Sequence, residues 1–209
     1  MIKASSRLSY VERIFDPYND RSSFYRLDRN EDPVGWDEEH YSHLMQRITP
    51  HDFAAYSDSN QLLVKLSNWL GVETDYIYIT AGADGAVKNI FEVYLDPSDV
   101  VLMQDPCWPM YRVYGNVYQA DSLQIGYDSS LYFHFDEVLH HLESTNLKLV
   151  ILANPNMPTG TILEYDQMRE ILELACYKDV LVVVDEAYYL FTPITTAELI
   201  RQYDNLIVV

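Results

Sequence analysis

The chain has 209 residues, of which 48% are hydrophobic and 22% charged, and its formal net charge is -18. This composition is ordinary for a globular protein that buries a core. So strong a negative charge predicts no binding to nucleic acid or to an anionic membrane surface, because both would repel the chain. No apolar run is long enough to span a bilayer, and the N-terminal residues lack the apolar core of a signal peptide. We therefore expect a cytoplasmic protein.

The N-terminal residues 1–36 are polar and irregular, with Asp-Pro pairs that break regular structure. We expect an arm over 1–36 and one large, incomplete domain over 37–209. A helix is predicted over 37–48. A second should follow Ser59, because apolar residues recur there at helical spacing, and it should end at Gly71.

Strands and helices then alternate along the chain. Strands are predicted over 76–80, 100–104, 122–127, 148–152, 180–184 and 205–209. Helices are predicted over 84–95, 109–118, 135–142 and 164–177, with a short one near 195–202. This alternation predicts an α/β fold with a mostly parallel sheet and helices on both faces.

Four polar or small-residue segments follow strands of this sheet: 81–86, 105–109, 153–161 and 185–188. Open α/β sheets bind ligands at the carboxyl ends of their strands. Asp185 and Glu186 stand there directly after four aliphatic residues. An aspartate after a buried strand can equally well cap a turn or a helix, so the position alone does not decide between the two.

Residues 81–86, Ala-Gly-Ala-Asp-Gly-Ala, join a predicted strand to a helix. Small residues at a helix start let backbone N–H groups approach a phosphate. The alternative is an ordinary tight turn with Asp84 as its cap. If a phosphate binds here, the Asp84 carboxylate must point away from it. Trp108, after the second strand of this series, could stack on a planar ligand or simply pack in the core.

Two motifs together are more specific. Asn-Pro-Asn-Met-Pro-Thr-Gly-Thr (154–161), followed one strand later by Val-Val-Asp-Glu-Ala-Tyr (183–188), resembles the pyridoxal-phosphate-dependent aminotransferases of fold type I. The resemblance is to the class I/II group that includes histidinol-phosphate aminotransferases. It extends to 27–33, Tyr56 and the turn at 82–84.

The resemblance implies pyridoxal 5'-phosphate as the cofactor. Asp185 matches the carboxylate that contacts the pyridine nitrogen, where it favours a cationic ring that withdraws electrons well. Tyr188 matches the tyrosine that hydrogen-bonds the phenolic oxygen, and Trp108 matches the aromatic residue that stacks on the ring. In these roles the carboxylate stands at the end of a core strand because a cationic ring would stand there too.

The phosphate contacts are implied in the same way. Ala83 and Asp84 match the residues whose backbone amides hold the phosphate. Tyr56 matches a tyrosine that reaches the phosphate of the neighbouring subunit, which implies a homodimer. Asn30 and Glu31 lie in the segment that helps to close the site.

Two positions depart from the family's pattern. Met157 stands where the family has an asparagine that bonds the phenolic oxygen, and methionine cannot donate that bond. Asn156 or Asn154 could compensate, and we include Asn156 among the expected cofactor contacts. Gly85 stands where the group commonly has glutamate. Both departures indicate a divergent or weakened site.

The lysine that forms the Schiff base in this family follows the next strand, so we expect it beyond Val209. None of the five lysines present stands at a matching position. The whole protein is then expected to move an amino group between an amino acid or amino-alcohol phosphate and a 2-oxo acid. This chain alone is expected to be inactive. The alternatives are another pyridoxal-phosphate enzyme of this fold, such as a decarboxylase or β-lyase, and a non-catalytic remnant.

Overall fold

The computed structural model describes residues 21–26, 30–32 and 34–209. The chain forms two compact units, and the described residues fall into 21–65 and 66–209. Most of residues 1–36 lie outside the described set. The division into an arm over 1–36 and a domain over 37–209 therefore stays a prediction.

The first unit contains η2 (Arg21–Ser23) and α1 (Glu38–Met45). The Asp37 carboxylate accepts a hydrogen bond from the His40 amide and so caps the start of α1. Helix α2 (Asn60–Leu70) begins in this unit and ends at Gly71, whose φ of 70° suits the residue after a helix. Both helices expected in this part of the sequence are confirmed.

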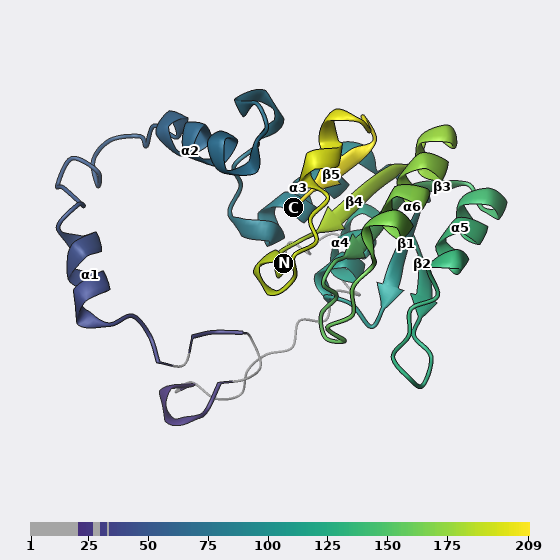
Figure 1. The fold of residues 1–209 in the computed structure, drawn as a ribbon, viewed down its shortest axis with the longest axis horizontal. Helices are drawn as coiled ribbons and strands as arrows, with labels where there is room; N and C mark the ends of the chain where they lie inside the picture. The colour runs from purple at the N-terminus through teal and green to yellow at the C-terminus, as the bar shows by residue number, and fades with distance from the viewer. Residues whose placement is uncertain (1–20, 27–29, 33) are drawn as a thin grey trace, which may run out of the picture. The chain divides into compact units, whose positions relative to one another are not determined.

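The second unit is built on five parallel strands in the order β2-β1-β3-β4-β5 (Figure 1). They are β1 (Val100–Asp105), β2 (Asp121–Gly126), β3 (Leu147–Ala153), β4 (Leu181–Asp185) and β5 (Leu206–Val208). Because the strands are parallel, their carboxyl ends share one edge of the sheet. The predicted α/β fold is confirmed.

The helices of the second unit cover both faces of the sheet. They are α3 (Gly82–Tyr94), α4 (Met110–Tyr118), α5 (Phe135–Ser144) and α6 (Tyr165–Tyr177). Side chains alternate along each strand, so Val182 and Val184 face one layer and Val183 faces the other. The first layer packs on α5 and α6, and the second packs on α3 and α4.

Two predicted elements differ from the structure. Residues 76–80 are not a strand: Thr74–Tyr76 form a 3-10 turn, η3, and the residues after it pair with no strand of the described chain, although Ile77 is extended. The alternating β-forming side chains predicted a strand, but a strand also needs a hydrogen-bonding neighbour. The helix near 195–202 is the short 3-10 helix η5 (Ala197–Arg201). Among the described helices, none has the length and apolar character needed to cross a membrane.

Candidate functional site

A cavity of about 210 Å³ lies at the carboxyl ends of the strands. It is lined by Ala83, Trp108, Tyr111, Ala153, Pro155, Met157, Asp185, Ala187 and Tyr188. These residues come from the starts of α3 and α4, from the segment after β1, and from the ends of β3 and β4 with the loops that follow them. Four of the seven residues expected to contact a cofactor therefore meet in one cavity: Ala83, Trp108, Asp185 and Tyr188.

Asp185 is the charged group of this cavity and only 6% exposed. Tyr111 Oη donates to its Oδ2 at 2.6 Å, and the Ala187 amide donates to its Oδ1 at 3.0 Å. Burial raises the pKa of Asp185 above its ordinary value, and these two hydrogen bonds oppose that rise. A buried carboxylate with further acceptor capacity is suited to receive a hydrogen bond from a cationic group.

Ala153 explains why the cavity reaches Asp185. Its Cα is paired with that of Asp185 in the register of β3 and β4. A methyl group at this position fills little space, so a planar ligand could lie over the strand ends. Neither Ala153 nor Tyr111 was expected from the sequence, although Tyr111 follows Trp108 by three residues, the spacing of one helical turn.

The start of α3 contributes Ala83 to the lining of the cavity. The N-cap residue is Ala81, whose methyl side chain cannot cap the first-turn amides. The Asp84 carboxylate instead accepts a hydrogen bond from Tyr114 Oη of α4 at 2.7 Å. This bond directs the charge of Asp84 toward α4. The expectation that Asp84 contributes its backbone and not its carboxylate is compatible with this geometry.

Gly85 follows in the first turns of α3. A Cβ added there would meet atoms of Thr80 and Ala81 at 3.5 Å or more, which are ordinary contacts. Packing in the described chain therefore does not require glycine at this position.

Trp108 is half-buried and stands edge-on to Tyr111, with ring centroids 5.5 Å apart and an interplanar angle of 88°. Such an edge-to-face contact is favourable for aromatic rings. Trp108 also lines the cavity. The two interpretations of this residue, stacking on a ligand and packing in the protein, are therefore not exclusive.

The loop after β3 is held by a chain of polar contacts. Asn154 bonds the backbone of Leu163 in both directions. Asn156 Nδ2 donates to Pro106 O at 3.0 Å and to Thr159 Oγ1 at 2.8 Å. Both amide hydrogens of Asn156 are thus in use, so donating to a cofactor would require it to give up one of these bonds. Its Oδ1, by contrast, is buried and has no hydrogen-bond partner among the described residues. Met157, and not Asn156, is the loop residue that lines the cavity beside Pro155.

Glu186 is buried like its neighbour Asp185 but has a different environment. Its Oε1 accepts from the amide and the hydroxyl of Thr196, at 2.6 and 2.7 Å, and its Oε2 accepts from Thr195 Oγ1 at 2.6 Å. These bonds fasten the segment before η5 to the end of β4. The two adjacent carboxylates therefore have different roles, and that of Glu186 is structural.

The remaining expected contacts lie in the first unit. Tyr56 has a fully exposed side chain. Its reach to a neighbouring subunit stays a prediction. Of the matching segment 27–33, residues 27–29 and 33 lie outside the described residues, and Glu31 pairs with Arg21 and Arg26 at 3.2 and 2.9 Å.

The two cysteines, Cys107 and Cys176, are free thiols. Cys107, which directly precedes Trp108, is buried, and this burial raises the pKa of its thiol to about 12. A thiol in that state is a poor nucleophile near neutral pH. Cys107 is therefore a core residue and not a reactive group of the site.

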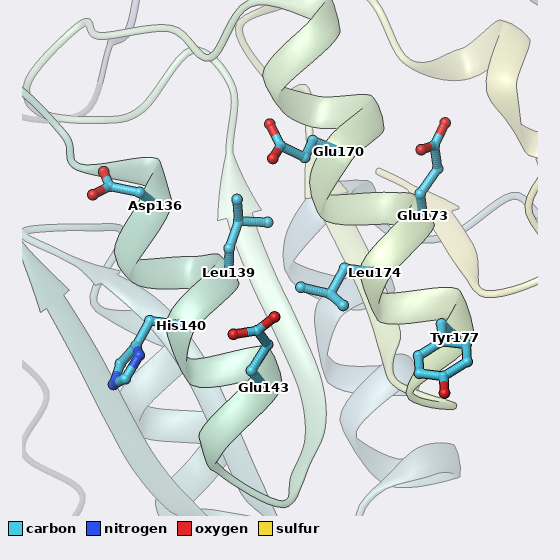
Figure 2. Close-up of a pocket in the computed structure, with 8 residues that line it drawn as sticks. All are labelled: Asp136, Leu139, His140, Glu143, Glu170, Glu173, Leu174 and Tyr177. Carbon is cyan, nitrogen blue, oxygen red and sulfur yellow. The ribbon is translucent and has the colours of Figure 1, made fainter.

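A second hollow lies between α5 and α6 (Figure 2). Leu139 of α5 and Leu174 of α6 lie along it, and the side chains of Asp136, His140, Glu143, Glu170, Glu173 and Tyr177 surround them. Its four carboxylates would repel an anionic ligand. The cavity at the strand ends is therefore the better candidate for a phosphorylated cofactor.

The sequence model of one family, aminotransferase class I and II, matches residues 36–209. This chain belongs to that family. A curated relative, histidinol-phosphate aminotransferase 1 of Carboxydothermus hydrogenoformans, is 30% identical over 185 residues, which are 88% of this chain and 52% of the relative. The chain thus spans about half the length of the curated relatives it matches.

Solved structures agree with this family in fold. Histidinol-phosphate aminotransferase from Sinorhizobium meliloti, solved with pyridoxal-5'-phosphate, aligns over 79% of this chain and 44% of its own, with a TM-score of 0.70 and 22% identity. A pyridoxal-phosphate-bound C-S lyase from Staphylococcus hominis covers 80% of this chain and 46% of its own, with a TM-score of 0.66 and 18% identity. The fold and the cofactor that the resemblance implies are therefore confirmed for the family. The fold does not determine which reaction is catalysed.

Proposed function

We propose that this chain forms the cofactor-binding part of an aminotransferase that uses pyridoxal 5'-phosphate. The observation that carries the proposal is the buried Asp185 carboxylate in the lining of the cavity, which also includes Ala83 at a helix N-terminus and the aromatic ring of Trp108. A cationic pyridine ring with a phosphate matches this arrangement of charge and shape. Pyridoxal phosphate, when bound, supplies an electron sink for the amino-acid substrate.

The residues of the chain divide the binding between them. Asp185 would pair with the protonated ring nitrogen, and Tyr188 would donate to the phenolic oxygen. Trp108 would cover one face of the ring. The first-turn amides of α3, at Ala83 and Asp84, would bind the phosphate, while Tyr114 keeps the Asp84 carboxylate turned toward α4.

The binding test uses pyridoxine 5'-phosphate, which has the ring and the phosphate but no aldehyde. It therefore cannot react with lysine side chains and reports only on the non-covalent site. We expect saturable binding to this chain by isothermal titration calorimetry, with pyridoxine binding far more weakly because it lacks the phosphate. Equal dissociation constants for the two ligands, or no detectable binding of pyridoxine 5'-phosphate, would contradict the proposal.

For the whole protein we propose transfer of an amino group from an amino acid or amino-alcohol phosphate to a 2-oxo acid. The lysine expected beyond Val209, a homodimer completed by Tyr56 and a cytoplasmic location are parts of the same proposal. Histidinol phosphate is the first donor to test, because the relatives are named for it. With 2-oxoglutarate as acceptor, glutamate formation is expected. Release of ammonia and a keto acid without an acceptor would favour a lyase, for which the C-S lyase of the same fold is the precedent.

Met157 makes a specific prediction about the site. Its thioether lines the cavity but cannot donate a hydrogen bond. Met157→Asn is expected to tighten pyridoxine 5'-phosphate binding by roughly fivefold, because one new hydrogen bond to the ring's phenolic oxygen contributes about 1 kcal/mol. The measurement is the dissociation constant by calorimetry. Met157→Leu is the matched control, with no donor and no expected gain, and a gain shared by both variants would show that shape and not hydrogen bonding was responsible.

A further inference from the structure

Tyr111 contacts two other residues that line the cavity, Trp108 and Asp185. Its side chain is fully buried, its ring stands edge-on to Trp108, and its hydroxyl donates to Asp185 Oδ2 at 2.6 Å. The contact joins residues 74 positions apart in the sequence. Tyr111 lies at the start of α4, and its amide bonds the Trp108 carbonyl at 3.2 Å, so its position is fixed through the backbone as well.

The hydroxyl of Tyr111 faces an unusual acceptor. Within the described chain, the donors on the Asp185 carboxylate are this hydroxyl and the Ala187 amide, and no cation contributes to its environment. A carboxylate buried without a cation favours its neutral form unless hydrogen bonds hold it charged. The hydroxyl of Tyr111 stays protonated, since burial and then the charge of Asp185 raise its pKa, so it remains a donor.

We propose that Tyr111 is a positioning residue for Asp185: its hydroxyl holds the carboxylate in the ionised form and in the orientation in which it faces the cavity. This inference rests on the proposed function in one respect, since a cationic ring nitrogen is the group that would use the ionised carboxylate. It goes further in assigning to Tyr111 the control of that charge before any ligand binds. Asp185 then presents a formed anion to the ring, and the ligand does not have to deprotonate it.

The test is the titration of Asp185 in the ligand-free chain. Aspartate carboxyl carbons are labelled with carbon-13 and followed by NMR against pH, and Asp185→Asn identifies the resonance. In the unchanged chain Asp185 is expected to be ionised at neutral pH. In Tyr111→Phe, which keeps the ring that fills the core, its titration should move up by about one to two pH units, the scale of one hydrogen bond to a charged group. Pyridoxine 5'-phosphate should also bind roughly tenfold more weakly near neutral pH, and the loss should shrink as the pH rises.

Tyr203→Phe is the matched control. Tyr203 is another largely buried tyrosine, 9% exposed, and its hydroxyl donates to Glu173 at 3.3 Å among the residues of the opposite core layer. It should leave the Asp185 titration and the binding unchanged. An Asp185 titration that does not move in Tyr111→Phe, or a protonated Asp185 at neutral pH in the unchanged chain, would overturn the inference. The second of these measurements needs no change at Tyr111.

The two proposals fail separately. If the unchanged chain does not bind pyridoxine 5'-phosphate but Tyr111→Phe shifts the Asp185 titration, the proposed function is wrong and the control of the charge stands. If the ligand binds and the titration does not move, the function stands and Tyr111 has only a packing role.

Discussion

Asp185→Asn is expected to weaken binding of pyridoxine 5'-phosphate by about 100-fold, in the lower part of the range for removing one member of a buried charge pair. Asparagine keeps the size of the side chain but supplies no negative charge for a protonated ring nitrogen. Calorimetric titration of the two chains measures the difference. A ligand analogue with carbon in place of the ring nitrogen should bind both chains about equally, which separates the charge from any change in the cavity's shape.

The same substitution is expected to stabilise the ligand-free chain. Burial raises the folded-state pKa of Asp185 above its ordinary value of 3.8, so the folded chain holds that proton more tightly than the unfolded chain. The stability contributed by this group is complete below the ordinary pKa and is lost as the pH rises through the folded-state pKa. At neutral pH the charged Asp185 therefore opposes folding.

Asparagine removes that cost while keeping both contacts. Its carbonyl can accept from the Ala187 amide, and its amide can donate to the Tyr111 hydroxyl oxygen. We expect Asp185→Asn to raise the free energy of unfolding at neutral pH by about 1 kcal/mol, as is common where a functional group is held at a cost in stability. Urea unfolding at pH 7 and at pH 3.5 measures this, and the gain should fade at the lower pH. A loss of stability at neutral pH would contradict the assignment.

The parallel sheet was predictable because its strands are nearly continuous aliphatic runs between helices with clear apolar faces. Leu181–Asp185 and the helix after Glu164 illustrate both signals. The failure at 76–80 has a physical reason: local side-chain preference reports a strand's propensity but not the presence of a neighbour to pair with. The 3-10 geometry at 197–201 likewise depends on the tertiary contacts of Glu186 and Leu199, which no local pattern reveals.

The site was predictable in part for a similar reason. Asp185, Tyr188 and Trp108 stand in motifs that are contiguous in sequence, so a resemblance could find them. Tyr111 matters through one contact with a residue 74 positions away, which only the fold brings about. Asn156 shows the converse. The sequence predicted that its side chain contacts the cofactor, whereas in the structure both of its amide hydrogens are donated to Pro106 and Thr159.

Glu186→Ala is expected to lower the free energy of unfolding by about 3 kcal/mol, without a direct effect on the cavity. The substitution leaves three donors without their acceptor, of which the two of Thr196 are buried and that of Thr195 is partly buried, and each unmet donor costs roughly 1 kcal/mol. Glu186→Gln should cost only about 1 kcal/mol, since its carbonyl can still accept from Thr196. Urea unfolding of the three chains at pH 7 measures the series.

Asp185→Asn and the Glu186 variants should differ in the sign of their effect on stability. The two carboxylates are adjacent in sequence and almost equally buried, at 6% and 7% exposure, yet their removal should change stability in opposite directions. The reason lies in their partners. The Glu186 carboxylate accepts hydrogen bonds from three donors and does not line the cavity. The Asp185 carboxylate accepts from two donors and lines the cavity. Similar losses of stability in both variants would show that Asp185, too, is held there for the fold, and the case for a cofactor at this carboxylate would fall with it.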